Sequence, residues 1–317
     1  MLEAILDRAN MRAAWEDVQA NQGAPGIDAV TLKRWGRNWE ANVERLRQQV
    51  RANTYHPNRP KRFKVLKKDG TFRELSILTV TDRVLQRAAL KVLEPLFERR
   101  FLNCSFGYRP KRSVANAITA VVRHRERGRV WVVDADIEKC FDNLDHALIL
   151  DLMKPNVPDV MVMNLLAAWL KTGASRSNSA ERSVSNLPSE IRNLKSKVGV
   201  PLGAVLSPLM CNVVLHELDV ALTRPGWTLV RYADDFIVLA DSEEQTAWAR
   251  VDVEEALTGL KLRLNERKTR LTSFEQGFRF LGVDFKDDTY AYVCQQKQIK
   301  VKGPTTRLLY DYHPQFY

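Results

Sequence analysis

Carboxylates stand at the ends of apolar segments in this sequence. Asp234 and Asp235 lie between two apolar runs, Trp227–Tyr232 and Phe236–Ala240. Aromatic and β-branched residues on both sides predict a hairpin with the aspartates at its tip, where Asp tolerates a tight turn. Asp136 ends another apolar run upstream. Carboxylates this close repel one another, and one gains a proton unless a cation lies between them.

A hairpin and a strand that end in carboxylates could build a metal site. If Asp136 meets Asp234 across a sheet, the carboxylates converge, and Mg²⁺ prefers such oxygens together with substrate phosphates. Two ions about 4 Å apart would activate an attacking hydroxyl and stabilise a leaving oxygen, which is the chemistry of in-line nucleotidyl transfer. A surface hairpin with an ordinary turn is the alternative for the acidic pair alone. Asp134 shares the predicted strand face with Asp136, and we expect it to be structural.

Several blocks in order along the chain resemble those of reverse transcriptases of the group II intron-like class, in their free-standing bacterial form. The blocks are D-I-x-x-x-F-D at Asp136–Asp142, Y-A-D-D at Tyr232–Asp235, S-x-G-x-R-P-x-R-S at Ser105–Ser113, G-x-P-x-G-x-x-x-S-P at Gly199–Pro208 and L-x-L-N-x-x-K-T at Leu262–Thr269. Each block alone is a weak signal, whereas the ordered set is specific. The resemblance covers roughly residues 1–285.

The resemblance implies an α+β fold, the right-hand polymerase architecture with an antiparallel palm sheet flanked by helices. We expect fingers over residues 1–130, with a basic hairpin at 57–80, and a palm over 131–285. A polar insertion is expected at 173–198. Residues 286–317 are expected to form a short C-terminal extension or a remnant of the thumb, with the thumb otherwise absent or very short.

The same resemblance assigns roles to individual residues. Catalysis is expected from Asp136, Asp234, Asp235 and Lys268, the last as a proton donor to departing pyrophosphate. Two Mg²⁺ ions, replaceable by Mn²⁺, are expected on Asp136, Ile137, Asp234 and Asp235. Nucleotide binding is expected from Lys67, Arg73, Phe141, Leu202 and Gly203. Contacts to nucleic acid are expected from Arg109, Lys111, Arg112 and Tyr232.

Some of these roles have competing interpretations. Phe141 matches the bulky side chain that excludes a 2′-OH in the family, but most Phe residues are simply core. The basic hairpin with Lys67 and Arg73 could equally be an edge strand protected by lysines. Leu202 departs from the family, which has Gln there, and an apolar side chain cannot hydrogen-bond an incoming nucleotide. That departure puts nucleotide selection or ordinary template copying in doubt.

Charge and composition agree with a polyanionic partner. The chain of 317 residues carries 49 Lys and Arg against 38 Asp and Glu, a net charge of +11, which favours nucleic acid. The 4 Cys are far apart, without zinc-finger spacing, and are typical of buried thiols in a reducing cytoplasm. No apolar run reaches membrane-spanning length, so we expect a cytoplasmic protein with no membrane partner.

The function predicted is RNA-directed DNA synthesis from dNTPs on an RNA template with a DNA or RNA primer. The biological role expected is antiviral defence or CRISPR spacer acquisition, with a non-coding RNA or a partner protein of that system. Two alternatives remain. One is a non-catalytic RNA-binding component with a polymerase fold, which Leu202 and the short C-terminal part favour. The other stays within the enzyme class and is template-independent or protein-primed nucleotide addition.

Overall fold

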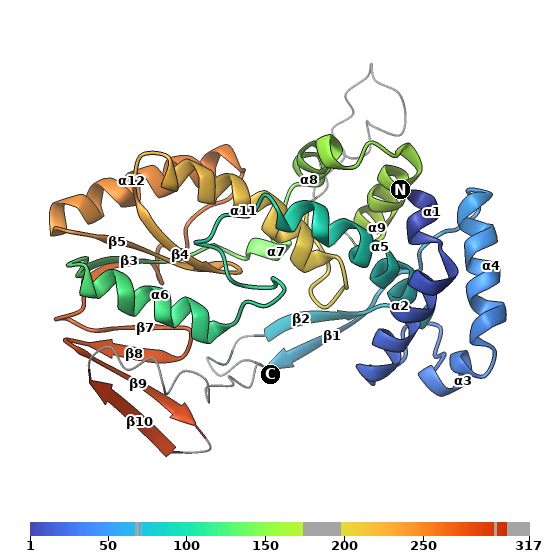
Figure 1. The fold of residues 1–317 in the computed structure, drawn as a ribbon, viewed down its shortest axis with the longest axis horizontal. Helices are drawn as coiled ribbons and strands as arrows, with labels where there is room; N and C mark the ends of the chain where they lie inside the picture. The colour runs from blue at the N-terminus through green and yellow to red at the C-terminus, as the bar shows by residue number, and fades with distance from the viewer. Residues whose placement is uncertain (67–69, 71, 174–197, 295–296, 303–317) are drawn as a thin grey trace. The chain divides into compact units, whose positions relative to one another are not determined.

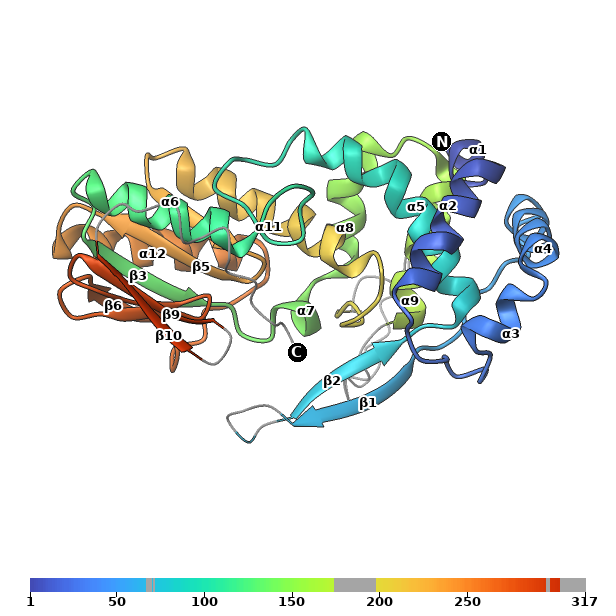
Figure 2. The same ribbon diagram turned by 60° about the horizontal axis from the view of Figure 1, so that its bottom comes forward.

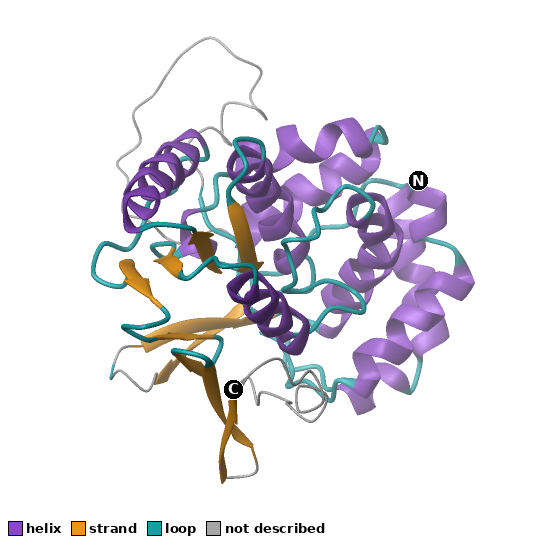
Figure 3. Ribbon diagram, turned by 60° about the vertical axis from the view of Figure 1, so that its left-hand side comes forward, coloured by secondary structure: helices purple, strands orange, loops and turns teal. Residues whose placement is uncertain are grey.

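The computed structural model describes residues 1–66, 70, 72–173, 198–294 and 297–302. Contacts divide the chain into two units, one of Met1–Arg100 with Phe141–Val213 and the other of Phe101–Cys140 with Val214–Tyr317. Helices and antiparallel strands both occur (Figure 3), so the chain is of the predicted α+β class. The predicted fingers and palm are defined by function rather than by contacts, and their boundaries stay a prediction.

The first unit is mainly helical. Its elements are α1 (Leu2–Ile5), α2 (Arg8–Ala20), α3 (Leu32–Gly36), α4 (Trp39–Arg51), α5 (Val80–Glu98), α8 (His146–Met153), η1 (Lys154–Asn156) and α9 (Val160–Gly173). The sequence predicts one helix over residues 3–21, but Asp7 interrupts it because its carboxylate accepts hydrogen bonds from the N–H groups of Ala9 and Asn10. The sequence also predicts one helix over residues 31–52 with Thr31 as its cap. Thr31 does cap α3, accepting from Arg34 N at 3.2 Å, but a break at Arg37 and Asn38 separates α3 from α4.

A hairpin extends from the helices of this unit (Figure 2). Strands β1 (Lys61–Leu66) and β2 (Phe72–Ile77) pair antiparallel, as the Asp69-Gly70 turn signal predicts. Lys67, Lys68 and Asp69 lie outside the described residues. Ser76 in β2 donates its N–H to the carbonyl of Leu202 at 2.8 Å, which joins the hairpin to the Gly199–Pro208 block.

The second unit contains a four-stranded antiparallel sheet in the order β4-β5-β3-β6. Its strands are β3 (Trp131–Asp136), β4 (Thr228–Tyr232), β5 (Asp235–Ala240) and β6 (Arg270–Ser273), and its helices are α6 (Val114–Glu126) and α12 (Glu243–Gly259). Figure 1 shows α6 and α12 on opposite faces of this sheet. Short α7 (Cys140–Asn143) and long α11 (Ser207–Thr223) each begin in one unit and end in the other.

A second sheet of the same unit follows α12. Strands β7 (Phe278–Phe280), β8 (Val283–Lys286), β9 (Thr289–Cys294) and β10 (Lys297–Lys302) form an antiparallel meander. One continuous core joins α6, the first sheet and this meander, and it includes Ile118, Val132, Ile237, Phe285 and Tyr292. The sequence predicts strands at Tyr290–Val293 and Ile299–Val301, and β9 and β10 confirm both.

Parts of the predicted organisation fall on residues that the structure does not describe. The polar insertion at 173–198 lies outside the described residues except at its two ends, and so does the chain beyond residue 302. Within the described part of the chain, no helix combines the length and the apolar character needed to cross a membrane.

Candidate active site

Strands β3 and β5 bring two of the predicted carboxylates together. Asp136 lies directly opposite Asp235 in the antiparallel register. Side chains of directly opposed residues share one face of a sheet, with Cβ atoms about 5 Å apart. Asp134, two residues earlier, lies on the same face and is opposite Ile237. The sheet therefore places an acidic cluster on one face at the end of β3, with Asp234 in the adjoining turn.

The turn between β4 and β5 contains only Ala233 and Asp234, since Tyr232 pairs with Asp235. The predicted hairpin with the aspartates at its tip is present, and within the turn Ala233 is the residue with positive φ, at 59°. A non-glycine residue in this region costs of the order of 1 kcal/mol or more, and it persists only where the surroundings enforce it.

The Ser105–Ser113 block supports this turn, and we call it the bracing segment. Ser105 forms a parallel bridge with Arg231, the Arg231 N–H donates to Cys104 O at 2.8 Å, and Phe106 N donates to Arg231 O at 2.8 Å. A Cβ built on Gly107 would lie 2.3 Å from the nitrogen of Ala233. Gly107 therefore lets the chain lie directly against the backbone of the acidic turn.

Asp235 has the clearest electrostatic signature in the cluster. Desolvation is the largest cause that raises its pKa to about 7, followed by repulsion from Asp234 and Asp136, while Lys268 acts in the opposite direction. Solvent nevertheless reaches a substantial part of this side chain. We therefore give more weight to the repulsion between carboxylates, which a bound cation would relieve.

Asp134, two residues before Asp136, also belongs to the acidic cluster. Burial raises its pKa to about 6, repulsion from Asp136 adds to the shift, and Arg270 opposes it. Arg270 in β6 is its direct neighbour in the register. Asp134 therefore has a cationic neighbour of its own, which fits the structural role predicted for it.

Asp136 is held by two residues of the Leu262–Thr269 block. Asn265 Nδ2 donates to Asp136 Oδ2 at 3.0 Å, and Asn265 N donates to the Asp136 carbonyl at 2.8 Å. Lys268 Nζ donates to Oδ1 at 3.1 Å, with 57% of the Lys268 side chain exposed. The sequence did not single out Asn265, although its place in the L-x-L-N-x-x-K-T block was the available signal. Lys268 pairs with a carboxylate here, and its role as a proton donor stays a prediction.

Ile137 could contribute only its main chain to a metal site, because its side chain is 2% exposed. An antiparallel bridge joins Ile137 to Leu264, and the hydrogen bonds flanking it run between Asp136 and Asn265 and between Glu138 and Arg263. In such a pair the carbonyl of the central residue points away from its partner. The Ile137 carbonyl thus faces the β5 side of β3.

The donor set suits a hard cation. It consists of carboxylate oxygens and one carbonyl, the ligands that Mg²⁺ takes. Desolvation and then repulsion from Asp234 and Asp136 raise the pKa of Asp235, and a bound cation would relieve the repulsion. Among the described residues, no group of three or more His, Cys, Asp or Glu side chains is already arranged around a single ion position. Binding of an ion by Asp136 would compete with the hydrogen bonds from Lys268 to the same carboxylate.

Two of the arginines expected to contact nucleic acid are engaged within the second unit. Arg109 is 6% exposed, and its Nη1 donates to the carbonyls of Leu102 at 2.6 Å and Ser105 at 2.8 Å. Arg112 donates to the carbonyl of Asn103 at 3.0 Å. These bonds shape the segment that braces the turn. Lys111 is exposed, with φ 61°, and Tyr232 is half-buried beside the core.

The nucleotide-binding residues expected elsewhere belong to the first unit. Arg73 is exposed on β2 opposite Val65, whereas Lys67 lies outside the described residues. Phe141 is 9% exposed, and its carbonyl accepts from Val200 N at 2.8 Å. The structure does not test whether Phe141 faces a nucleotide.

Gly203 has a structural reason to be glycine. Its φ is +97°, and a Cβ there would lie 2.8 Å from the carbonyl oxygen of Ser76. The sequence pattern predicts close approach by a ligand at this glycine, but the close approach in the structure is to strand β2. Leu202, its neighbour, is half-buried and uses its carbonyl to accept from Ser76 N.

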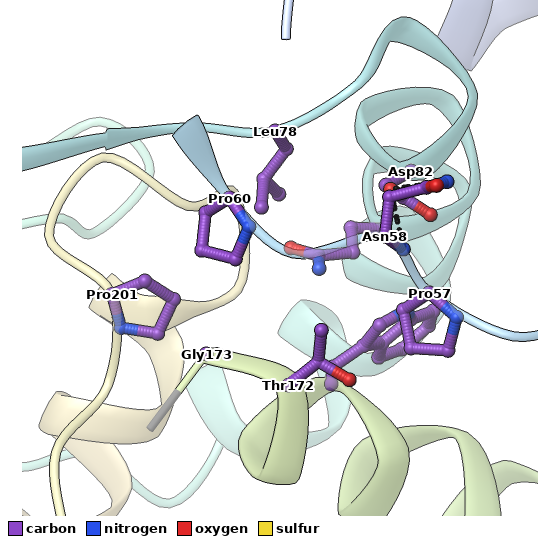
Figure 4. A pocket seen from close by; sticks show the side chains of 10 residues that line it. Pro57, Asn58, Pro60, Leu78, Asp82, Thr172, Gly173 and Pro201 are labelled. Carbon is purple, nitrogen blue, oxygen red and sulfur yellow. Dashed lines mark hydrogen bonds between the residues drawn. The ribbon is translucent and has the colours of Figure 1, made fainter. Parts of the chain in front are cut away.

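A hollow of about 230 Å³, including its open mouth, lies elsewhere in the first unit. Its walls include Pro57, Asn58, Asp82, Trp169 and Pro201 (Figure 4). The Asp82 carboxylate accepts from Tyr55 OH at 2.5 Å, Thr79 Oγ1 at 2.7 Å and Asn58 N at 3.1 Å. Because neutral donors already satisfy this carboxylate, the hollow offers little to a cation.

A family model described as "Reverse transcriptase (RNA-dependent DNA polymerase)" matches residues 65–285. This range contains the acidic cluster, Asn265 and Lys268. It also contains every residue for which the sequence predicts a role in the site.

Two curated proteins and one solved structure are similar to the chain. Protein YkfC of Escherichia coli K12 is 30% identical over 298 residues, covering 81% of this chain and 74% of YkfC. The group II intron-encoded protein LtrA of Lactococcus lactis is 27% identical, covering 86% of this chain and 54% of LtrA. A structure of apo telomerase from Candida tropicalis matches with a TM-score of 0.50 and 11% identity, over 73% of this chain and 46% of that chain. The last match concerns the fold alone.

Proposed function

Because the chain belongs to the reverse transcriptase family, whose members are RNA-dependent DNA polymerases, we propose that it extends a primer with dNTPs on an RNA template at the acidic cluster. The family and the fold class expected from the sequence are confirmed. The observation that carries the location of the site is the direct opposition of Asp136 and Asp235, with Asp234 in the adjoining turn.

In this proposal Asp136, Asp234, Asp235 and the Ile137 carbonyl hold two Mg²⁺ ions. Two such ions supply activation of the primer hydroxyl and stabilisation of the leaving phosphate oxygen. The chain contributes the geometry. Asn265 orients Asp136 through two hydrogen bonds, the Ser105–Ser113 block supports the turn, and the register fixes Asp136 relative to Asp235.

Protonation is part of this mechanism. The raised pKa of Asp235 means that near pH 7 a substantial fraction of the cation-free protein carries a proton on this carboxyl. A proton there competes with a cation for the same oxygens. The rate of polymerisation should therefore increase with pH as Asp235 loses its proton and becomes free to bind a cation. In the cation-free protein Lys268 donates to Asp136, and its ammonium group beside the site would serve as the proton donor to departing pyrophosphate.

The substrate contacts rest on residues outside the acidic cluster. We propose that Lys67 and Arg73 bind the triphosphate, that Phe141 excludes ribonucleotides, and that Leu202 and Gly203 lie near the incoming nucleotide. Lys111 and Tyr232 are proposed to contact the template or primer. We leave Arg109 and Arg112 out of this set, because their guanidinium groups donate to main-chain carbonyls of the bracing segment.

Primer extension tests the function. Purified protein, Mg²⁺ and dNTPs are incubated with a labelled primer on an RNA template or on a DNA template of the same sequence. Asp234→Asn is compared with Asp241→Asn, a matched control at the exposed far end of β5. DNA complementary to the RNA from wild type and Asp241→Asn, but not from Asp234→Asn, is the expected result. No product from wild type on primed RNA would contradict the proposal.

Two other outcomes correspond to the alternative functions. Product whose sequence ignores the template would indicate untemplated addition, for which Leu202 in place of the family's Gln is the motivating feature. RNA binding that is equal in wild type and Asp234→Asn, without product from either, would indicate a non-catalytic RNA-binding component.

The biological role we propose is antiviral defence or CRISPR spacer acquisition, with a non-coding RNA or a protein of that system as partner. Purification of the tagged protein from its host, followed by sequencing of the bound RNA and identification of bound proteins, tests this role. Recovery of one defined RNA or one protein of such a system is expected, whereas random RNA fragments alone would contradict it.

A further inference from the structure

Arg231 is a completely buried cation two residues before the acidic turn. Its side chain is 0% exposed, and so is that of its partner Asp219 in α11. Side chains alternate along a strand, so Arg231 lies on the face of the sheet opposite Tyr232 and the acidic cluster. Nothing in the proposed mechanism so far uses this buried pair.

The guanidinium group of Arg231 makes hydrogen bonds in three directions. Nε and Nη2 donate to the two carboxylate oxygens of Asp219, each at 2.6 Å. Nη2 also donates to Ser105 Oγ at 2.8 Å. Nη1 donates to the carbonyl oxygen of Ala233 at 2.9 Å. One side chain thus joins α11, the bracing segment and the turn that contains Asp234.

The bond to Ala233 reaches the backbone of the site. The carbonyl of Ala233 and the nitrogen of Asp234 belong to one planar peptide group. A donor that holds this carbonyl therefore holds the whole peptide group, and with it the backbone that carries the Asp234 side chain. Ala233 also has the costly φ of 59°, so the turn needs an interaction that holds it in this conformation.

A contribution to stability does not by itself explain why the chain contains such a buried ion pair. Desolvation of two charges offsets much of their attraction, and buried ion pairs can often be replaced by apolar residues without loss of stability. A fixed geometry is what the pair does supply, because the planar guanidinium fork meets a carboxylate through two parallel bonds.

We propose that Arg231 is a positioning residue for DNA synthesis, which holds the Ala233–Asp234 peptide group in place and is itself oriented by Asp219. The inference rests on the proposed function of the acidic cluster. It predicts that loss of the fork moves the carboxylate of Asp234 relative to Asp136 without exposing the core.

The main test removes both charges together. The double variant Arg231→Met with Asp219→Leu leaves no single charge buried, so the fold is expected to survive. We expect a melting temperature close to wild type, a kcat for primer extension reduced about tenfold to hundredfold, as for a misplacement of about 1 Å, and weaker Mn²⁺ binding measured by electron paramagnetic resonance. The KM for dNTPs should change much less than kcat.

Asp252→Asn is the matched control. Asp252 accepts from Trp227 Nε1 at 2.6 Å, a bond between α12 and the start of β4 that does not reach the turn. This variant is expected to lose some stability and to keep the kcat and Mn²⁺ affinity of wild type. A double variant with native melting temperature, wild-type kcat and wild-type Mn²⁺ affinity would overturn the inference.

If the double variant does not fold, two milder variants test the inference instead. Arg231→Lys keeps the charge, but its three N–H donors cannot replace the four bonds that the guanidinium group makes to Asp219, Ser105 and Ala233, and Ser105→Ala removes one bond. Reduced kcat and Mn²⁺ affinity in folded Arg231→Lys, with a smaller reduction in Ser105→Ala, supports the inference, and wild-type values in both overturn it. Absence of product from wild type itself would instead contradict the proposed function.

Discussion

Two buried or partly buried acidic sites in this chain differ in what surrounds them. In the first unit, Asp82 is 0% exposed and accepts hydrogen bonds from Tyr55, Thr79 and Asn58. In the second unit, Asp235 faces the carboxylates of Asp136 and Asp234. Burial is the largest cause of a raised pKa at both sites, but only the second has like charges among the causes.

The two sites differ in how their negative charge is compensated. Neutral donors satisfy Asp82, so its negative charge requires no further ligand. The charge at Asp235 is opposed by the carboxylates of Asp234 and Asp136, and a proton or a cation would relieve this repulsion. A buried carboxylate is therefore a weak indication of function by itself, whereas several carboxylates that repel one another are a stronger one.

The largest predicted effect separates the two sites directly. Asp136→Asn removes a proposed metal ligand, so primer extension should fall at least about a thousandfold, more than the loss of one hydrogen-bond donor, with little change in melting temperature. Asp82→Asn should lower the free energy of unfolding by about 1–3 kcal/mol, because one of its donors loses an acceptor. Single-turnover extension and urea denaturation of both variants measure this. An equal loss of stability in Asp136→Asn and Asp82→Asn would contradict the difference that we draw between the two sites.

Gly107→Ala should give the next largest effect. A Cβ at this position would lie 2.3 Å from Ala233 N and 2.9 Å from Tyr232 C, both main-chain atoms that cannot move aside alone. We expect the turn to shift and kcat to fall about a hundredfold. Gly259→Ala is the control, because among the described residues no heavy atom beyond its chain neighbours and the backbone of its own helix lies within 4 Å of the position that a Cβ would take there. Extension at the wild-type rate by Gly107→Ala would show that the bracing segment does not set the turn.

Asn265→Ala should have a moderate effect. The variant removes the amide that donates to Asp136 Oδ2 and keeps the main-chain bond to the Asp136 carbonyl. Residues that orient a metal ligand are typically worth about tenfold to a hundredfold in metal affinity or activity, and we expect the lower end. The Mg²⁺ concentration for half-maximal extension should rise, and an unchanged value would exclude an orienting role for Asn265.

The smallest effect concerns stability and pH. The pKa of Asp235 rises from 3.8 to about 7 on folding, so between these values the folded protein binds more protons than the unfolded chain. The contribution of this group is therefore fully present below pH 3.8 and is lost as pH rises through about 7. Without divalent cations, Asp235→Asn should gain melting temperature relative to wild type as pH rises over this window, and Asp241→Asn should not. Parallel curves for all three proteins would contradict the raised pKa.

Much of this fold could be predicted from the sequence, because hydrophobic periodicity and turn signals act locally. The hairpin of β4 and β5, the strand ending at Asp136 and the cap at Thr31 all follow from such signals. The break at Asp7 was missed because one capping carboxylate outweighed a helical pattern that continues through it.

The contacts that build the site could not be predicted in the same way, because they join residues far apart in the chain. Arg109 is an ordinary basic residue in the sequence, and its bonds to the carbonyls of Leu102 and Ser105 are seen only in the structure. Arg231 lies in an apolar strand, and its partner Asp219 on α11 gives no separate signal. Gly107 is explained only by the backbone that lies against it.

Counting the bound cations is the first test of a metal site at the acidic cluster. Mn²⁺ binding is measured by electron paramagnetic resonance on the protein with primed RNA, using a primer that lacks its 3′-OH, and a matching dNTP. We expect two tightly bound ions for wild type and for Asp241→Asn, and fewer for Asp136→Asn and Asp234→Asn. The same number of ions with the same affinity in all four proteins would contradict a metal site at the carboxylates of Asp136, Asp234 and Asp235.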